Sequence, residues 1–247
     1  MAKAAGSTGY HIITGGAGFI GSVTAGELNQ LGEDRIIISD HLGESAKWRN
    51  LRGLRFQDYL EKDLFRRMIA DGDFDNTPVK SVVHFGACSS TTEKDCSYLA
   101  DNNFQFSKEL AEFALRRGIR FVYASSAATY GDGSLGWKDD EVGIASLRPL
   151  NMYGYSKQLF DMWAWRNGLF RRITGLKFTN VFGPNEWHKG EMRSVVCKAF
   201  DQIRETGRLR LFKSHRKEFV DGGQKRDFLY VRDAAAMAIF LLERRIC

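Results

Sequence analysis

Cysteine is scarce in this chain, and long apolar runs are missing from it. The four cysteines, Cys88, Cys96, Cys197 and Cys247, show no C-x-x-C spacing, which argues against a metal site or a disulfide scaffold and indicates a reducing cytoplasm. No apolar run approaches the roughly 20 residues needed to cross a bilayer, so we expect no membrane span. The N-terminal segment has no apolar stretch of the secretion-signal type and reads as a short lead into the first strand.

Positive charge is in modest excess, and part of it is clustered. The chain has 36 Lys and Arg against 30 Asp and Glu, a net charge of +6, with basic clusters at 204–210 and 213–217. Such clusters suit a nucleic acid, a phosphorylated small substrate or simply a solvated surface. Nucleic-acid binding has charge alone in its favour, so we rank it last and expect a small-molecule partner.

Short buried-type strands alternate with helical segments along most of the chain. The pattern predicts strands at 10–14, 35–39, 80–85, 119–124 and 175–181, and helices from the glycine-rich turn to about residue 31, at 95–117 and at 153–172. This alternation predicts an α/β fold with a doubly wound, Rossmann-type parallel sheet. Its ligand site is expected at the carboxyl ends of the strands.

The pattern changes after Pro184. A polar loop is followed by an amphipathic helix near 192–205, a short strand at 209–212, a loop containing glycines at 221–223, and a last strand and helix at 228–245. We therefore expect a dinucleotide-binding domain over residues 1–181, to which 226–247 return. Residues 182–225 are expected to form a small substrate-binding subdomain.

The clearest local motif is a glycine-rich turn between the first strand and the helix that follows it. Glycine there permits a tight turn, close approach of backbone N–H groups to a pyrophosphate, and close packing of helix on strand. An acidic residue ends the next strand, as in dinucleotide-binding sites. The motif predicts such a site at Gly15, Gly18, Gly21 and Asp40.

The surroundings of Asp40 leave the choice between NAD and NADP open. Its carboxylate can accept hydrogen bonds from the adenosine ribose diol, which favours NAD. Lys47, Arg49 and Lys62 follow Asp40 in the sequence, and a cation beside this ribose can hold a 2′-phosphate. NADP therefore stays an alternative despite the aspartate.

A tyrosine and a lysine are spaced for acid/base chemistry. Tyr153 and Lys157 fall one helical turn apart on the same face, so the ammonium can sit near the phenol. A phenol ionises near pH ~10, and a neighbouring cation lets it take a proton from an alcohol near neutral pH. Ser126 ends a predicted strand and can hydrogen-bond the reacting hydroxyl or ketone, with Ser125 as its nearest competitor. Together these residues predict a dehydrogenase-type site.

Several motifs taken together are more specific than any one of them. They are the runs at 14–21, 86–92, 101–103, 123–131 and 153–157, and above all the stretch 180–190, Asn-Val-Phe-Gly-Pro-Asn-Glu-Trp-His-Lys-Gly. In these motifs the chain resembles the ADP-L-glycero-D-manno-heptose 6-epimerase family, a branch of the extended short-chain dehydrogenases. The resemblance runs from Tyr10 to about Leu242. It implies a cytoplasmic, homo-oligomeric nucleotide-sugar epimerase of lipopolysaccharide core biosynthesis.

The resemblance also implies a reaction without net redox change. Tightly bound NADP removes hydride from C6 of the heptose in an ADP-glycero-manno-heptose, which leaves a transient ketone, and returns the hydride to the opposite face. Two acid/base groups on opposite faces are then required, and the family pattern gives these roles to Tyr153 and Lys189. Ser126 and Lys157 assist Tyr153. By residue type alone Lys189 would be a solvated loop residue, but desolvation or nearby cations lower the pKa of a lysine enough for this role.

Carried over position by position, the family pattern gives two binding sets. Besides the glycines, the cofactor set is Phe19, Ile20, Asp40, His41, Lys47, Lys62, Phe85, Gly86, Ala87, Cys88, Ser89, Asn102, Lys157 and Val181. The substrate set is Asn180, Glu191, Lys198, Phe212, Lys213, Ser214, His215 and Arg226. The planar guanidinium of Arg226 suits a diphosphate oxygen, whereas Glu191 departs from the family pattern and is unhelpful beside an anionic substrate.

The largest departure from the family is at the end of the chain. Relatives continue past the helix that ends near Leu242 into a further strand and subdomain, so we expect a truncated substrate subdomain here. Three alternatives stay open: a 4-epimerase or 4,6-dehydratase of another nucleotide sugar, a dinucleotide sensor, and a cofactor-binding but inactive fragment. The dehydratase is disfavoured because two alanines follow Ser126, where elimination of water needs an acid and a base.

Overall fold

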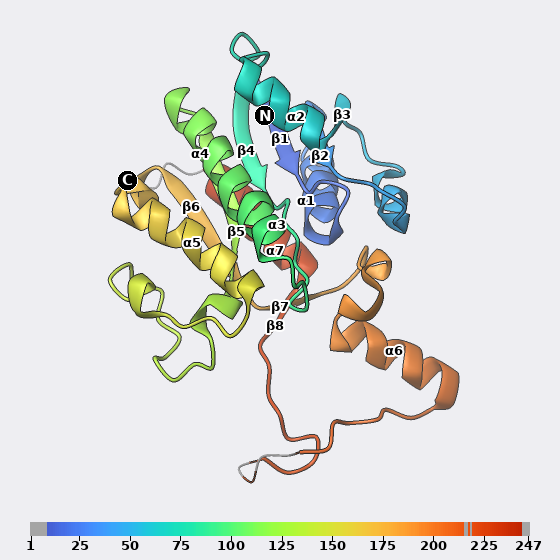
Figure 1. Cartoon of the computed structure of the whole chain (residues 1–247). Helices are drawn as coiled ribbons and strands as arrows, with labels where there is room; N and C mark the ends of the chain where they lie inside the picture. The colour runs from blue at the N-terminus through green and yellow to red at the C-terminus, as the bar shows by residue number, and fades with distance from the viewer. Residues whose placement is uncertain (1–8, 215–216, 218, 244–247) are drawn as a thin grey trace.

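The computed structural model describes residues 9–214, 217 and 219–243. At its centre six parallel strands form a sheet in the order β3-β2-β1-β4-β5-β6 (Figure 1). The strands are β1 Tyr10–Thr14, β2 Ile36–Asp40, β3 Asp58–Glu61, β4 Val79–His84, β5 Arg120–Ser126 and β6 Ile173–Phe178. The strand order reverses between β1 and β4, so the crevice for a ligand lies beyond the carboxyl ends of these two strands.

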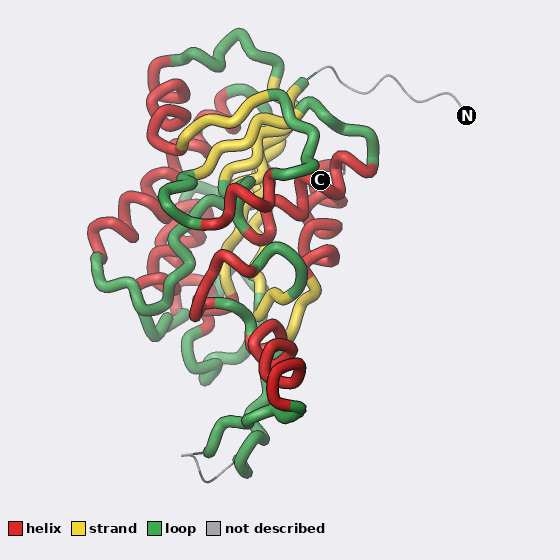
Figure 2. Tube along the Cα trace, turned by 90° about the vertical axis from the view of Figure 1, so that its right-hand side faces the viewer, coloured by secondary structure: helices red, strands yellow, loops and turns green. Residues whose placement is uncertain are grey.

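Each face of the sheet packs against its own helices, because successive side chains of a strand point to opposite faces. Ile12 and Val82 share a core with α2, α4 and α5, whereas Ile13 and Val83 share a second core with α1 and α7. Figure 2 shows the resulting three layers. The helices are α1 Phe19–Gln30, α2 Lys62–Asp71, α4 Phe106–Arg116, α5 Met152–Arg166 and α7 Val231–Glu243.

Shorter helical pieces connect these elements. They are α3 Cys96–Leu99, a π-helix at Ala100–Gln105, and 3-10 helices at Ala46–Leu51, Ala127–Tyr130, Ile144–Ser146, Leu169–Arg171 and Trp187–Met192. Two of them bear on the candidate site, since the π-helix faces the loop after β4 and the helix at Ala46–Leu51 follows Asp40.

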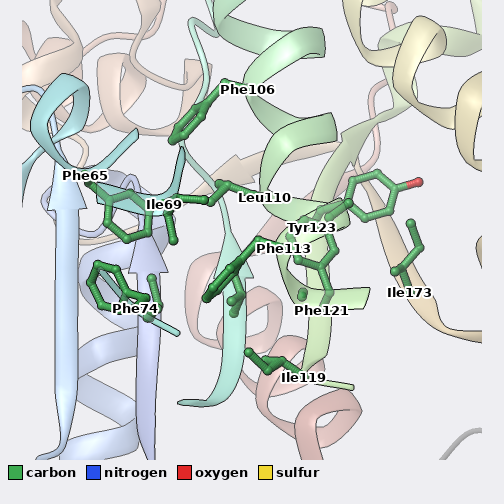
Figure 3. Packing of buried hydrophobic residues seen from close by; sticks show 14 of the residues in the cluster. Phe65, Ile69, Phe74, Phe106, Leu110, Phe113, Ile119, Phe121, Tyr123 and Ile173 are labelled. Atoms are coloured by element: carbon green, nitrogen blue, oxygen red, sulfur yellow. The ribbon is translucent and has the colours of Figure 1, made fainter. Parts of the chain in front are cut away.

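Aromatic rings dominate the larger core (Figure 3). Phe74 meets Phe65 edge to face at 5.5 Å between ring centroids, and meets Phe113 in the same way at 6.4 Å. Full burial of one such side chain contributes roughly 1.5–3 kcal/mol. The core therefore fixes the strands whose carboxyl ends carry the candidate site.

The structure confirms the doubly wound parallel sheet, with differences in detail. The sequence analysis does not include β3 and α2. β3 buries only Leu60, whereas α2 has apolar residues at helical spacing, with Phe65 and Ile69 buried. The helix expected at 153–172 ends at Arg166, and Gly168 then takes a positive φ of 62°. The strand expected at 175–181 is two strands, divided at Thr179.

A second, smaller sheet pairs β7 Asn180–Phe182 in parallel with β8 Phe228–Tyr230. Between them come α6 Val195–Thr206 and a segment whose described residues project away from the main sheet (Figures 1 and 2). The strand predicted at 209–212 is wrong. Leu211 and Phe212 are exposed there, and no strand in the described part of the chain lies alongside to pair with them. None of the described helices has the length and apolar character needed to cross a membrane.

Candidate active site

Neighbouring strands bring the predicted residues to one edge of the main sheet. The glycine-rich turn follows β1, Asp40 ends β2, Phe85 follows β4 and Ser126 ends β5. These strands are hydrogen-bonded neighbours in parallel register, so their carboxyl ends lie side by side. The candidate site is therefore at the edge where doubly wound sheets bind their ligands.

The turn between β1 and α1 has no room for side chains at its glycines. Gly15 has a φ of +67°, and a Cβ atom there would lie 2.7 Å from the backbone nitrogen of Gly86. A Cβ atom on Gly21 would collide with the Gly15 carbonyl oxygen. Gly18 is the N-cap of α1 and provides no side-chain cap for the N–H groups of the first turn. A tight turn that leads into an uncapped helix N-terminus fits the diphosphate of a dinucleotide.

Asp40 is buried, and the protein engages both of its carboxylate oxygens. Oδ2 accepts a hydrogen bond from the Ala17 N–H at 2.9 Å. Oδ1 accepts one from the His41 N–H at 2.7 Å and one from the Lys47 ammonium at 2.6 Å. The imidazole of His41 lies 2.6 Å from Glu61, from its Nδ1 to Oε1. Asp40 thus orders the glycine turn and holds a cation beside it.

Two asparagines of the π-helix hold the loop that follows β4. Asn102 accepts a hydrogen bond from the Lys62 ammonium at 3.0 Å. Asn103 is fully buried and binds the Cys88 backbone twice, through its Oδ1 and its Nδ2, each at 2.9 Å. Its Nδ2 also donates to Ser156 on α5 at 3.0 Å. Sequence reasoning named Asn102 and missed Asn103, whose adjacency to Asn102 was the available signal.

The remaining predicted cofactor residues line the same edge. Phe19, Ile20 and Val181 belong to one apolar cluster, which places β7 against the start of α1. Phe85 packs edge to face on Phe178 at 5.7 Å. The residues after it are half-buried as far as Cys88, and the next one is exposed. Because Gly86, Ala87 and Ser89 have small side chains, this part of the sheet edge presents mainly backbone.

Tyr153 lies in the first turn of α5, and the Ser126 hydroxyl hydrogen-bonds its phenol. Burial raises the pKa of Tyr153, and the hydrogen bond from Ser126 acts in the opposite direction. Lys157 is buried one helical turn later and donates to the Ala124 carbonyl oxygen at 2.9 Å. Burial lowers the pKa of Lys157 to about 8. The structure therefore brings Ser126 to Tyr153, and it buries Lys157 one turn further along the same helix with its ammonium on the Ala124 carbonyl oxygen.

A buried polar network that the sequence analysis did not find lies one turn beyond Lys157. The Asp161 carboxylate accepts hydrogen bonds from Tyr123 at 2.8 Å, from Ser125 at 2.6 Å and from the Lys177 ammonium at 2.7 Å. Ser125, the alternative to Ser126 in the sequence analysis, is therefore engaged by Asp161. The spacing of four residues from Lys157 was the signal that could have found it. A cavity of about 250 Å³ borders this network, and Tyr153 is not among the residues that line it.

Lys189 lies on a loop that docks on the glycine turn. Asn185 donates from Nδ2 to the Ser22 hydroxyl at 3.0 Å, and its carbonyl oxygen accepts from Asn50 at 3.1 Å. The Lys189 ammonium lies 5.6 Å from the centre of the Phe19 ring. Burial lowers the pKa of Lys189. The side chain is thus half-buried beside α1 rather than solvated.

Glu186 anchors the same loop. It is 1% exposed, and its Oε1 accepts hydrogen bonds from the Gly183 N–H at 3.0 Å and the Ser194 hydroxyl at 2.9 Å. Its Oε2 accepts from the Ser194 N–H at 2.6 Å. One carboxylate therefore closes the loop on both sides of Lys189. Sequence spacing gave no signal for this role, because the partners are backbone groups and a serine.

Three predicted substrate residues lie in the stretch from β7 to α6. Asn180 in β7 donates to the Asp227 carbonyl oxygen at 3.1 Å. Glu191 and Lys198 form an ion pair, with 3.1 Å between Oε2 and Nζ. This ion pair offsets the negative charge of Glu191, which would otherwise be unfavourable beside an anionic substrate.

The other predicted substrate residues lie on the segment after α6. Phe212 and Lys213 are exposed, and Ser214 donates its N–H to Asp221 at 2.6 Å. Arg226 is exposed and donates to its neighbouring backbone carbonyl. His215 is outside the described residues. The segment that follows α6 projects away from α5 (Figure 1), so the structure does not bring Phe212, Lys213 and Ser214 to Tyr153. Arg226 instead precedes Asp227, whose carbonyl oxygen Asn180 of β7 contacts.

A family model described as the NAD dependent epimerase/dehydratase family matches residues 11–246. An ADP-L-glycero-D-manno-heptose-6-epimerase of Nitratidesulfovibrio vulgaris is 52% identical over 233 residues, which are 94% of this chain and 72% of that protein. One from Fusobacterium nucleatum is 45% identical over 235 residues, 94% of this chain and 70% of that protein.

Solved structures show the same fold. The crystal structure of Helicobacter pylori ADP-L-glycero-D-manno-heptose-6-epimerase superposes with a TM-score of 0.80 at 24% identity, over 96% of this chain and 74% of that chain. At that identity the likeness establishes the fold, which agrees with the doubly wound sheet described above.

Proposed function

Because this chain belongs to the NAD dependent epimerase/dehydratase family, we propose that it inverts C6 of the heptose in an ADP-glycero-manno-heptose. The family resemblance inferred from the sequence is confirmed by relatives of 44–52% identity that carry the name ADP-L-glycero-D-manno-heptose-6-epimerase. Their agreement disfavours a 4-epimerase acting on another nucleotide sugar.

A bound nicotinamide dinucleotide supplies reversible hydride transfer at C6 of the sugar. The residues present fit this cofactor. The turn at Gly15–Gly21 leads into the N-terminus of α1, which no side chain caps, so its backbone N–H groups suit a diphosphate. Phe85–Ser89 and Val181 lie along the same edge for the nicotinamide half.

Tyr153 takes the proton of the C6 hydroxyl as the hydride leaves, so the carbon is oxidised to a ketone. Ser126 donates a hydrogen bond to the sugar oxygen, and the ammonium of Lys157 favours the phenolate form of Tyr153. After the ketone presents its other face, Lys189 donates a proton to its oxygen as hydride returns to carbon. The reverse direction uses the same groups with their roles exchanged, and no net oxidation results.

The position of Lys189 is the observation that carries this proposal. A dehydrogenase needs one acid/base group, whereas inversion needs a second one that approaches from the other face. Lys189 is on a loop docked at the start of α1, and burial lowers its pKa toward the range in which an amine exchanges protons. Tyr153 reaches the site from α5, across the sheet edge.

We also propose NADP as the cofactor and residues 182–225 as the substrate-binding subdomain. Both carboxylate oxygens of Asp40 already accept protein hydrogen bonds, and Lys47 retains donors beside it. A 2′-phosphate would satisfy Lys47 better than a ribose diol would. The substrate set then contributes Asn180 and Arg226 to the sugar nucleotide.

The direct test is to incubate the protein with ADP-heptose of one C6 configuration and follow that configuration by NMR. The account predicts a mixture of both epimers without accumulation of reduced cofactor. The double variant Tyr153→Phe, Lys189→Met should produce no inversion, whereas Tyr155→Phe, an exposed tyrosine on the same helix, should retain it. Full activity in the double variant would overturn the proposal.

A further inference from the structure

Glu186 carries a buried negative charge that the reaction as described does not use. It is 1% exposed, and its carboxylate accepts hydrogen bonds from the Gly183 N–H, the Ser194 N–H and the Ser194 hydroxyl, at 2.6–3.0 Å. That hydroxyl in turn accepts the Cys197 N–H at 3.1 Å, so its own proton is directed at the carboxylate. All three partners donate, and none of them requires a proton on Glu186. The contacts therefore fit the ionised carboxylate.

No described cation lies at ion-pair distance from this anion. The cations that follow on the same segment are engaged elsewhere, Arg193 with Asp201 at 2.7 Å and Lys198 with Glu191 at 3.1 Å. The N-terminus of α6, capped by Ser194, provides only a partial positive charge. A buried charge without a counter-ion is costly, so an ammonium nearby would stabilise it.

Lys189 is placed to provide that ammonium. It follows Glu186 by one turn of the 3-10 helix Trp187–Met192, and its backbone N–H donates to the Glu186 carbonyl oxygen at 3.0 Å. Its side chain lies against the Phe19 ring and forms no ion pair with a described residue. Burial lowers the pKa of Lys189, and the charge of Glu186 acts in the opposite direction. Glu186 thus offsets part of the cost of burying the ammonium.

The other ionisable groups on this side of the loop are paired or neutral. The Lys47 ammonium pairs with Asp40 at 2.6 Å. His188 precedes Lys189, and burial, Lys47 and Lys189 lower its pKa, so its imidazole is uncharged at neutral pH. Among the described residues this leaves Glu186 as the negative charge that acts on Lys189.

We propose that Glu186 is a positioning residue for the reaction: its carboxylate is the counter-charge that holds the Lys189 ammonium on the loop and retains its proton until the ketone accepts it. This inference rests on the proposed function, because it concerns the second acid/base group of the same site. The proton passes from Nζ to the ketone oxygen as hydride returns to C6. The amine then regains a proton from solvent, to which Tyr153 loses the one it took.

The test compares inversion of ADP-heptose across pH, starting from the epimer whose hydroxyl faces Tyr153. Without the charge of Glu186 the pKa of Lys189 falls further. Glu186→Gln should therefore lose about 10-fold in inversion at alkaline pH and approach the wild-type rate as pH falls.

Two matched variants keep the charge and change the contacts. Glu186→Asp shortens the side chain, and Ser194→Ala removes one hydrogen bond to the carboxylate. Each should lower inversion by the same factor at every pH. A ratio of Glu186→Gln to wild type that does not vary with pH would overturn the inference, as would the same pH-dependent loss in Glu186→Asp.

A second measurement does not depend on catalysis. Because Glu186 and Lys189 attract each other, the double variant Glu186→Gln, Lys189→Met should lose less unfolding free energy than the sum of the two single losses. If Glu186→Gln does not fold, Lys189→Met alone suffices, since its stability relative to wild type should improve as acid protonates the carboxylate.

Additive losses, or a relative stability of Lys189→Met that acid leaves unchanged, would contradict the counter-charge. Failure of the proposed function has a different signature, namely wild-type protein that leaves C6 uninverted while the two substitutions remain non-additive in unfolding.

Discussion

The two regions that carry the proposed acid/base groups are built in different ways. Tyr153 and Lys157 lie on α5, which packs on the main sheet through Phe160 and Ala164, both nearly inaccessible to solvent. Lys189 lies on a loop that is held by the Glu186 carboxylate and a few amide hydrogen bonds. One region is fixed by a hydrophobic core and the other by polar contacts.

This difference suggests a division of labour. The core-backed region places a phenol, a serine and an ammonium within a rigid frame, as precise proton transfer requires. The loop needs to admit the sugar and let the ketone present its other face. It also carries α6 and the exposed segment that projects from the sheet. Perturbing the first region should therefore stop proton transfer on the face that Tyr153 serves, whereas perturbing the second should mainly impair proton transfer on the opposite face of the ketone.

The largest expected effect comes from removing the phenol. Tyr153→Phe should lower epimerisation about 10²- to 10⁴-fold, the usual contribution of a positioned acid/base group. Cofactor affinity should change little, since the glycine turn is untouched. Steady-state kinetics with NADPH titration checks both expectations. Loss of activity together with loss of cofactor would show that Tyr153 supports binding instead.

Lys189→Met should lower epimerisation by about 10²-fold, at the smaller end of that range, because water can reach a half-buried loop site and replace the base in part. The variant should still oxidise the epimer whose hydroxyl faces Tyr153. Rapid mixing would then show a transient of reduced nicotinamide without inversion. Equal loss of this transient with both epimers would contradict the separation into two regions.

Asp161→Asn tests how much the buried hydrogen-bond network around Asp161 contributes to the stability of the fold. Lys177 would lose its carboxylate partner, and breaking a buried ion pair costs about 3–5 kcal/mol; since Lys177 is partly accessible, we expect the lower end of this range. The free energy of unfolding in urea measures the effect. Asp201→Asn, which breaks a more exposed pair with Arg193, should cost less than about 1 kcal/mol. Similar losses of unfolding free energy in the two variants would show that the buried network around Asp161 contributes no more to stability than the more exposed ion pair does.

A further expected effect is on the pH dependence of stability. Burial lowers the pKa of Lys157 in the folded protein to about 8, from 10.5. As pH rises through about 8, the folded state releases this proton while the unfolded chain keeps it, so stability should rise with pH up to about 10.5. Compared with Lys157→Met, the wild type should therefore gain stability between these values. Equal slopes for the two proteins would contradict a depressed pKa of Lys157.

Local motifs could be predicted from the sequence, and long-range polar contacts could not. The glycine turn, Asp40 and the Tyr153–Lys157 pair each depend on spacing within one turn or strand end, which the sequence displays directly. Asn103 and Glu186 act through backbone groups of distant or folded-back segments. Such partners exist only once the fold has formed.

The errors in the fold prediction have a similar origin. β3 buries only Leu60, and pairing with β2 makes it a strand. The helical spacing of Leu64, Phe65, Met68 and Ile69 in α2 was a signal that the prediction did not use. The segment 209–212 has strand-like composition but no neighbouring edge in the described structure. Strand formation depends on a partner, and composition alone does not reveal one.

The most direct test of the central claim uses ADP-heptose with deuterium at C6. The account predicts that wild-type protein equilibrates the two C6 epimers while the deuterium stays on C6, since the same hydride leaves and returns. Single variants at Tyr153 and Lys189 should each retain the label and lose inversion. Replacement of the deuterium by solvent hydrogen, or absence of inversion in the wild type, would contradict a hydride mechanism served by a rigid base on α5 and a second base on the loop.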